Sequence, residues 1–280
     1  MKLHFTKMHG AGNDFVMIDD RSLTVPWEDY PLMAAIAARR TGIGCEGIIL
    51  VQPSDKADFR MRFLNPDGSE VELCGNGARC AAAFAHDLGI AAKAMTIETM
   101  VGLVDAEIDG DGVKVWMPDP SNRRYDVTLS VANKKYTGHV LSIGCPHFVV
   151  PVDPEELDDF DVAHVGAALR QHEFFSPEGV NVDFVSYLQS NLIRMRTYER
   201  GVEAESGACG TGAVAAAVVG VECLRGTLPV KVSTMGGFEL SVDGDWRTKK
   251  CTGVTLTGPA KRVYEGEIDL DAIEGEHEMD

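Results

Sequence analysis

The sequence carries one pattern twice, and this internal repeat restricts the fold more than any other feature. Cys74-Gly75-Asn76-Gly77-Ala78 returns 135 positions later as Cys209-Gly210-Thr211-Gly212-Ala213, and each copy opens a run of small apolar residues. The flanks repeat in the same order, with an Arg-Met-Arg segment before each copy and a Thr-Met segment after it. Several matches in one order at a nearly constant offset indicate two structurally equivalent halves, each with a cysteine at the start of a helix.

Two prolines mark the predicted boundary between these halves. Pro118-Asp119-Pro120 and the polar residues after it are typical of a linker between domains. We therefore expect a first half of residues 1–118, completed by a C-terminal strand from residues 258–280, and a second half of residues 119–257. The tail of residues 265–280 is strongly acidic and is expected to fray at its end.

Each half contains short strand-like segments and one almost wholly apolar helix, predicted at residues 77–86 and 213–222. A helix without a polar face must be buried on every side, and a strongly curved sheet can surround it. The predicted fold class is α+β, with two pseudo-symmetric domains, each a curved sheet or barrel around a central apolar helix. Shorter helices are predicted at residues 33–40 and 162–172. We expect the two cysteine-bearing helix starts to face each other across a cleft.

Charge and composition exclude several classes of function. The net charge of −17 argues against a nucleic-acid partner, because no basic stripe is present to neutralise phosphates. The longest uncharged segment, residues 206–221, is too short and too glycine-rich for a membrane span, which needs ~20 apolar residues. The N-terminus shows no signal peptide, and an odd number of cysteines, seven, is typical of reduced thiols. We therefore predict a cytoplasmic protein.

The glycines that follow each repeated cysteine predict a specific chemistry. A Gly-x-Gly helix start leaves several backbone N–H groups unpaired, and together with the positive end of the helix dipole they form a site for a carboxylate. The same field favours a thiolate, so a cysteine at this position should have a lowered pKa. Two such sites in a duplicated chain indicate that one sulfur removes a proton from a carbon while the other delivers one from the opposite side, which inverts that carbon.

A simpler interpretation is that each cysteine is a small buried side chain before a turn. The occurrence of a cysteine at equivalent places in both halves favours the acid/base role over this interpretation. Among the other cysteines, Cys80 and Cys223 are expected to fill the core, and Cys45 and Cys251 have no chemical partner visible in the sequence. No Cys and His spacing suits zinc, and Gly75-Asn76-Gly77 lacks the third glycine of a dinucleotide fingerprint. We expect neither a metal nor a cofactor.

Five motifs together resemble the diaminopimelate epimerase family over nearly the whole chain. They are His9-Gly10-Ala11-Gly12-Asn13-Asp14-Phe15, Asn65-Pro66-Asp67-Gly68-Ser69, Cys74-Gly75-Asn76-Gly77-Ala78-Arg79-Cys80, Glu199-Arg200-Gly201 and Ala208-Cys209-Gly210-Thr211-Gly212. The resemblance implies a cofactor-independent epimerase with two active-site cysteines and two barrel-like domains, each around a central helix. It implies conversion of LL-2,6-diaminopimelate to the meso form for lysine and peptidoglycan synthesis, by a cytoplasmic homodimer acting on this small-molecule substrate.

The resemblance also implies a role for each matching residue. Cys74 and Cys209 would be the acid/base pair. The residues that would bind the reacting carboxylate are Gly75, Asn76, Gly210 and Thr211. Those that would hold the substrate, chiefly at its distal amino-acid end, are Asn13, Asn65, Asn181, Glu199 and Arg200.

Two departures from the family pattern concern specificity. Cys145 stands before Pro146-His147 where the family usually has an asparagine that contacts the distal end, and the segment of residues 199–209 is one residue longer than in many members. Two other hypotheses therefore stay open. One is a racemase of a different amino acid, such as glutamate or histidine, with the same two-cysteine chemistry. The other is an isomerase-like fold whose thiols serve redox sensing.

Overall fold

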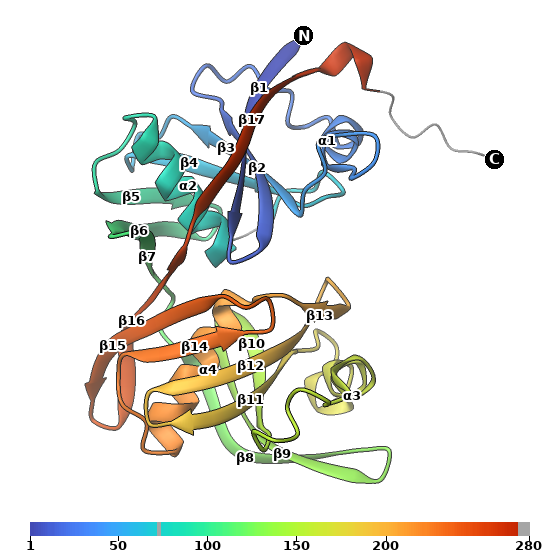
Figure 1. Ribbon diagram of the computed structural model, residues 1–280, viewed down its shortest axis with the longest axis vertical. Helices are drawn as coiled ribbons and strands as arrows, with labels where there is room; N and C mark the ends of the chain where they lie inside the picture. The colour runs from blue at the N-terminus through green and yellow to red at the C-terminus, as the bar shows by residue number, and fades with distance from the viewer. Residues whose placement is uncertain (72–73, 274–280) are drawn as a thin grey trace, which may run out of the picture. The chain divides into compact units, whose positions relative to one another are not determined.

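The computed structural model describes residues 1–71 and 74–273, and the chain divides into two compact units (Figure 1). The first unit comprises Met1–Val115 together with Gly258–Asp280, and the second comprises Trp116–Thr257. Both ends of the chain therefore belong to the first unit. The predicted fraying of residues 274–280 falls outside the described residues, whereas Glu265 lies within a regular strand.

The sheet of the first unit begins with a strand from the C-terminal end of the chain. Its order is β17, β1, β2, β3, β4, β5, β6 and β7, and neighbours are antiparallel except for the parallel pairs β2–β3 and β4–β5. The strands are β1 (Lys2–Gly10), β2 (Asn13–Asp19), β3 (Gly47–Gln52), β4 (Phe59–Leu64), β5 (Ala94–Thr99), β6 (Gly102–Asp109), β7 (Gly112–Trp116) and β17 (Lys261–Asp269).

The sheet of the second unit has the order β8, β9, β10, β11, β12, β14, β15 and β16, with the parallel pairs β10–β11 and β12–β14. A short strand, β13, forms a hairpin on β12. The strands are β8 (Ser121–Val131), β9 (Lys134–Ile143), β10 (Cys145–Pro151), β11 (Asn181–Gln189), β12 (Leu192–Glu199), β13 (Ala204–Ser206), β14 (Val230–Thr234), β15 (Glu239–Arg247) and β16 (Lys250–Pro259).

The two sheets match strand for strand, because parallel and antiparallel pairs follow one another in the same sequence from edge to edge. The repeat seen in the sequence is thus a repeat of the whole fold. β17 takes in the first unit the edge position that β8 takes in the second. The predicted α+β class with two pseudo-symmetric halves is confirmed.

Each sheet curves around one buried helix, as Figure 1 shows for each unit. In the first unit α2 (Gly75–Asp87) contacts β1, β2, β3, β4 and β6, and in the second α4 (Gly210–Cys223) contacts β9, β10, β11, β12, β14 and β15. Ten of the 13 residues of α2 and eleven of the 14 residues of α4 are buried. A helix in contact with so many strands is covered on all sides, which explains why its sequence has almost no polar face.

The shorter helices begin where an aspartate caps them. α1 (Tyr30–Ala37) starts and ends three residues before the predicted span, because the Asp29 carboxylate accepts the Leu32 N–H at 3.1 Å and Pro31 favours the first turn. α3 (Val162–Arg170) is capped in the same way by Asp161. Two short 3₁₀ helices complete the fold, η1 (Glu173–Phe175) and η2 (Leu270–Ala272).

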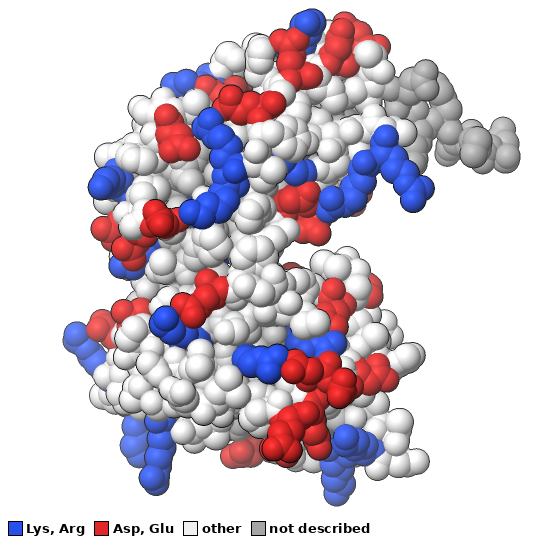
Figure 2. Space-filling view, in the orientation of Figure 1, with Lys and Arg blue, Asp and Glu red and all other residues white. Residues whose placement is uncertain are grey.

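Acidic and basic side chains are interspersed over the face of the molecule drawn in Figure 2. None of the helices within residues 1–71 and 74–273 combines the length and apolar character needed to cross a membrane.

Candidate active site

Each repeated cysteine is the residue immediately before the first turn of a buried helix. Cys74 precedes α2 and Cys209 precedes α4, both in an extended conformation, and neither side chain caps its helix by a hydrogen bond. The first bonds within the two helices run from Ala78 N–H to the Cys74 carbonyl and from Ala213 N–H to the Cys209 carbonyl. The two helices therefore begin with the same hydrogen-bond pattern, and a helix start of this kind is where an anion site is expected.

In the first unit, three of the predicted site residues meet around one amide oxygen. The Asn13 Oδ1 atom accepts hydrogen bonds from the Cys74 thiol at 3.5 Å and from the Asn76 Nδ2 group at 3.2 Å. Asn13 is oriented from its other side, because its Nδ2 group donates to Glu46 Oε2 at 2.5 Å. The turn between β1 and β2 thus positions the sulfur at the start of α2.

Arg79 donates hydrogen bonds to residues in the first turn of α2. Its side chain is fully buried and donates to Asn76 Oδ1 at 2.7 Å, to the Gly75 carbonyl at 3.3 Å and to the Pro259 carbonyl at 3.5 Å. Burial lowers the pKa of this guanidinium, and the charges of Cys80 and then of Cys74, as thiolates, act in the opposite direction. Cys74 therefore has a buried cation as its neighbour.

In the second unit, Cys209 lies in a negative environment. Burial raises the pKa of the Cys209 thiol well above its usual value, and the charges of Glu199, Asp183 and Cys145 add to this effect, while a hydrogen bond with Thr211 opposes it. The sulfur lies 3.5 Å from Thr211 Oγ1. The predicted lowering of the cysteine pKa by the helix start is therefore wrong for Cys209, because burial and nearby carboxylates outweigh the helix field.

Asn181, predicted to hold the substrate, is part of a fixed network at the start of β11. Its Oδ1 atom accepts the backbone N–H of Arg200 at 2.8 Å, and its Nδ2 group donates to the Cys145 sulfur at 3.4 Å. The Arg200 guanidinium lies 3.4 Å from the Glu178 carbonyl. Within this unit the structure thus brings Asn181 and Arg200 together, and it brings Cys145 within 3.6 Å of Thr211 Oγ1.

Three polar residues near this network were missed by the sequence reasoning as functional candidates. His147 and Asp183 are fully buried, and His147 Nδ1 lies 2.8 Å from Asp183 Oδ2. The Thr197 hydroxyl donates to the other oxygen of Asp183 at 2.8 Å. On its far side, His147 Nε2 lies 3.3 Å from the Cys145 sulfur. The available signal was a charged residue, Asp183, inside an otherwise apolar strand.

The first unit has apolar residues at the same places. The register of β2 on β3 and of β10 on β11 makes Phe15 equivalent to His147 and Ile49 equivalent to Asp183. The next strand makes Phe63 equivalent to Thr197. Phe15 and Phe63 pack edge to face, with ring centroids 6.0 Å apart. This fold therefore accommodates either an apolar cluster or a polar chain beneath the helix start.

Gly77 and Gly212 are equivalent glycines in the first turns of α2 and α4, and the space around them shows how closely each helix packs on the cluster beneath it. A Cβ on Gly212 would lie 2.4 Å from Asp183 Oδ1, whereas a Cβ on Gly77 would meet the flexible end of Ile49 at 3.0 Å. We expect Gly212→Ala to destabilise the protein by about 1–3 kcal/mol, because Asp183 is held by two hydrogen bonds and cannot move away. Gly77→Ala should cost less, and urea unfolding of both variants measures the difference. Equal losses would contradict this account.

The remaining site predictions concern Asn65 and the relation between the helix starts. Asn65 lies in the turn after β4, where its N–H donates to the Ser69 carbonyl at 2.8 Å and its carbonyl accepts the Gly68 N–H at 2.9 Å. The expectation that the two helix starts face each other across a cleft stays a prediction. Within the described ranges, no group of three or more His, Cys, Asp or Glu side chains has an arrangement that could hold a metal ion.

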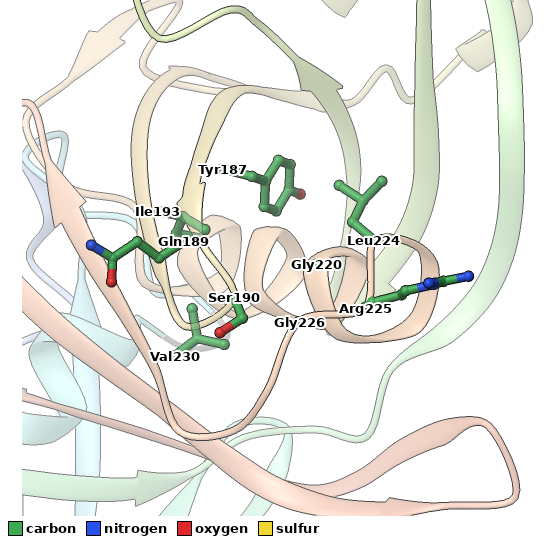
Figure 3. Close-up of a pocket in the computed structure, with 9 residues that line it drawn as sticks. All are labelled: Tyr187, Gln189, Ser190, Ile193, Gly220, Leu224, Arg225, Gly226 and Val230. Carbon is green, nitrogen blue, oxygen red and sulfur yellow. The ribbon is translucent and has the colours of Figure 1, made fainter.

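The second unit also has a pocket of about 240 Å³ at the opposite end of α4 (Figure 3). It lies between the β11–β12 turn, including Gln189 and Ser190, and the residues that follow α4, including Leu224 and Arg225. The Tyr187 ring lines it, and its hydroxyl donates to the Ala216 carbonyl at 3.1 Å. Cys209 begins the other end of this helix, so the pocket is separate from the predicted acid/base residue.

Solved structures of epimerases, racemases and PhzF-type proteins have the same two-domain fold as this chain. A PhzF-family phenazine biosynthesis protein from Bacillus anthracis has a TM-score of 0.73 at 15% identity, over 96% of this chain and 99% of that chain. A hydroxyproline epimerase from Agrobacterium vitis has a TM-score of 0.73 at 17% identity, over 98% of this chain and 94% of that chain. At such identities the likeness shows the fold alone.

Sequence comparison gives the family. The sequence model of the diaminopimelate epimerase family matches residues 5–122 and 139–263. A protein named diaminopimelate epimerase from Aquifex aeolicus (strain VF5) is 40% identical, over 97% of this chain and 100% of that protein. One of the same name from Azoarcus sp. (strain BH72) is 41% identical, over 96% of this chain and 100% of that protein. The chain belongs to the diaminopimelate epimerase family, whose members are isomerases that work without pyridoxal phosphate.

Proposed function

We propose that this protein interconverts LL-2,6-diaminopimelate and meso-2,6-diaminopimelate, with Cys74 and Cys209 as the acid/base pair, in the synthesis of lysine and peptidoglycan. The observation that carries the proposal is the repeated placement of a thiol immediately before a buried helix, in both halves of a chain that belongs to this family. One sulfur removes the Cα proton and the other returns a proton to the opposite face, which inverts the carbon without a cofactor.

The charges around the two sulfurs support different resting roles. Cys74 has the buried Arg79 guanidinium as its neighbour, which attracts a thiolate. Cys209 has Glu199 and Asp183 nearby, and its raised pKa keeps it protonated. In this proposal Cys74 loses its proton more readily and acts first as the base, and Cys209 supplies the proton.

The substrate contacts follow from the two helix starts and the loop after β12. The backbone N–H groups of Gly75, Asn76, Gly210 and Thr211 bind the reacting carboxylate and stabilise negative charge that spreads from the α-carbon. Arg200 pairs with the distal carboxylate and Glu199 with the distal ammonium group. Asn13, Asn65 and Asn181 supply further amide contacts to the substrate, in agreement with their places in turns and at strand starts.

Deuterium incorporation tests this function directly. The purified protein is incubated with LL-diaminopimelate in D₂O. The stereoisomers are separated by chiral chromatography, and the deuterium content of each is measured by mass spectrometry. We expect the meso isomer to form with a deuteron at the inverted carbon, because the returning proton comes from a thiol that exchanges with solvent. Activity should survive a chelator and a carbonyl reagent, since the proposed reaction uses neither a metal nor pyridoxal phosphate.

A panel of amino acids serves as the control for substrate identity. Glutamate and histidine are incubated under the same conditions, and exchange at their α-carbons is measured. Exchange with one of them but none with diaminopimelate would replace this proposal with a racemase of a different amino acid.

The proposal extends to a homodimer in the cytoplasm, as expected from the family resemblance. Light scattering of the purified protein should give about twice the chain mass of 30.3 kDa. A monomer with full activity would contradict the dimer as the working form.

A further inference from the structure

Cys145, His147 and Asp183 form a continuous relay in the second unit, with distances of 3.3 Å from sulfur to imidazole and 2.8 Å from imidazole to carboxylate. Asp183 accepts from Thr197, which fixes the carboxylate, so His147 carries a proton on Nδ1 and presents Nε2 to the sulfur. The relay has the order of a nucleophile, a base and a group that orients the base.

Other groups around the sulfur favour its anionic form. The Asn181 amide is oriented by its bond from the Arg200 N–H, so its Nδ2 group must donate to the Cys145 sulfur. Thr211 Oγ1 lies 3.6 Å from the sulfur and accepts its S–H when the thiol is protonated, so the donors to the sulfur are the Asn181 amide and the imidazole. A sulfur that faces an amide N–H and an imidazole is placed as an acceptor of hydrogen bonds, which stabilises a thiolate.

The fold does not require this relay. The equivalent positions of the first unit hold Phe15 and Ile49, and Asn13 occupies the position equivalent to Cys145. Two copies of one architecture thus differ by a connected Cys–His–Asp set. The hydrogen bonds of His147 and Asp183 lead to the partly exposed Cys145 sulfur, which packing alone does not require.

We propose that Cys145, His147 and Asp183 constitute a reactive-thiolate site for small uncharged electrophiles, hydroperoxides in particular, in addition to the acid/base pair Cys74 and Cys209.

The acid strengths of the groups agree with this geometry. Burial alone would raise the pKa of Cys145, but the His147 charge and the hydrogen bonds with His147 and Thr211 outweigh it, and the pKa lies below its usual value. Burial would lower the pKa of His147, yet the charges of Asp183 and Cys145 raise it to about 10. Burial raises the pKa of Cys45 to about 11 and that of Cys251 to about 12. Cys145 thus differs from the other thiols for which the direction is known.

The reaction with a hydroperoxide balances within the relay. The Cys145 thiolate attacks one peroxide oxygen, the O–O bond breaks, and sulfur becomes a sulfenic acid with the loss of two electrons. The departing hydroxide or alkoxide takes the proton from His147 Nε2, which leaves a neutral imidazole. The peroxide is thereby reduced to water or an alcohol.

Size and charge set the class of electrophile. Cys145 is only partly exposed, so a bulky reagent cannot reach the sulfur. The groups in contact with the sulfur are His147 on its own strand, Asn181 on β11 and Thr211 on α4. The charge of Asp183 acts on Cys145, and that of Glu199 acts on Cys209 nearby. Two carboxylates near a thiolate disfavour an anionic reagent.

Competitive alkylation of the full chain tests the site without any use of substrate. The protein is treated with iodoacetamide at pH 6.5, and each cysteine peptide is quantified over time by mass spectrometry. Cys145 should be labelled at least about tenfold faster than Cys209, because an ordinary thiol is only about 1% ionised at this pH. After exposure to hydrogen peroxide, dimedone should label Cys145 as a sulfenic acid.

Two variants separate reactivity from folding. His147→Phe introduces the residue type of the equivalent position in the first unit, and Asp183→Asn keeps the shape of the carboxylate while removing its charge. Both should slow labelling of Cys145 about tenfold or more. Cys251 is buried in the same unit and should stay unlabelled in both, which shows that the second unit remains folded; if His147→Phe does not fold, Asp183→Asn still provides the test.

The proposal is overturned if Cys145 reacts no faster than Cys209 in the wild-type protein, or if its rate is unaffected in the folded variant. These outcomes do not depend on the proposed epimerase function, since no turnover is measured.

Discussion

Replacement of Cys209 by alanine should reduce kcat/KM for the interconversion of the diaminopimelate isomers by about 10²–10⁴-fold, the usual contribution of a positioned general acid or base. Cys209 is buried, has a raised pKa and lies 3.5 Å from Thr211 Oγ1, so its sulfur keeps a proton that it can donate. Its loss leaves the carboxylate-binding backbone in place but removes the proton donor. The measurement is formation of the meso isomer from the LL isomer.

The same helix offers a matched control. Cys223 is the last residue of α4, and burial raises the pKa of its thiol to about 11. Cys223→Ala removes the same chemical group from the other end of the helix and should leave kcat/KM at the wild-type value. A comparable loss in both variants would show that damage to α4, and not loss of the acid, explains the effect.

The double variant Cys74→Ala plus Cys209→Ala distinguishes two thiols that act together from two that act independently. If each sulfur serves one face of the same carbon, either single replacement already stops inversion, and the second should add little. Epimerisation at the wild-type rate in the double variant would reject the acid/base assignment. It would favour the hypothesis that the thiols serve redox sensing.

The fold could be predicted to a large extent from the sequence because the repeat consists of short sequence patterns that are recognisable locally. An Ala-rich helix without a polar face, preceded by Cys-Gly-x-Gly, predicts burial at both α2 and α4, and the structure agrees. The starts of the helices could not be placed as well. α1 begins at Tyr30 because the Asp29 side chain caps it, and this depends on a single turn of backbone conformation that periodicity does not reveal.

The electrostatic difference between the two units could not be predicted in the same way. Arg79 and Val214 occupy equivalent positions of α2 and α4, yet only the structure shows that Arg79 reaches Pro259, 180 residues away. His147 and Asp183 are 36 residues apart and meet only because β10 pairs in parallel with β11. Contacts of this kind depend on strand register, which a local sequence pattern does not determine.

Arg79→Met should destabilise the first unit by about 3 kcal/mol, because hydrogen bonds to a charged donor contribute about 1.5–3 kcal/mol each. The replacement leaves Asn76 Oδ1 and the carbonyls of Gly75 and Pro259 without that donor. Part of the loss is offset, since a buried charge no longer has to be desolvated. Methionine fills most of the volume, so the effect reports the polar contacts; urea unfolding of the full chain measures it.

Arg79→Met should also change the pH dependence of turnover. Removal of the cation next to Cys74 disfavours the thiolate, so kcat/KM should fall at neutral pH and recover as the pH rises. Val214→Ala, at the equivalent position of α4, should destabilise the second unit by about 2 kcal/mol through a cavity, without a change in the shape of the pH profile. An Arg79→Met variant that lost stability but kept the wild-type profile would reduce Arg79 to a structural anchor. It would remove the argument that Cys74 is the thiol that ionises first.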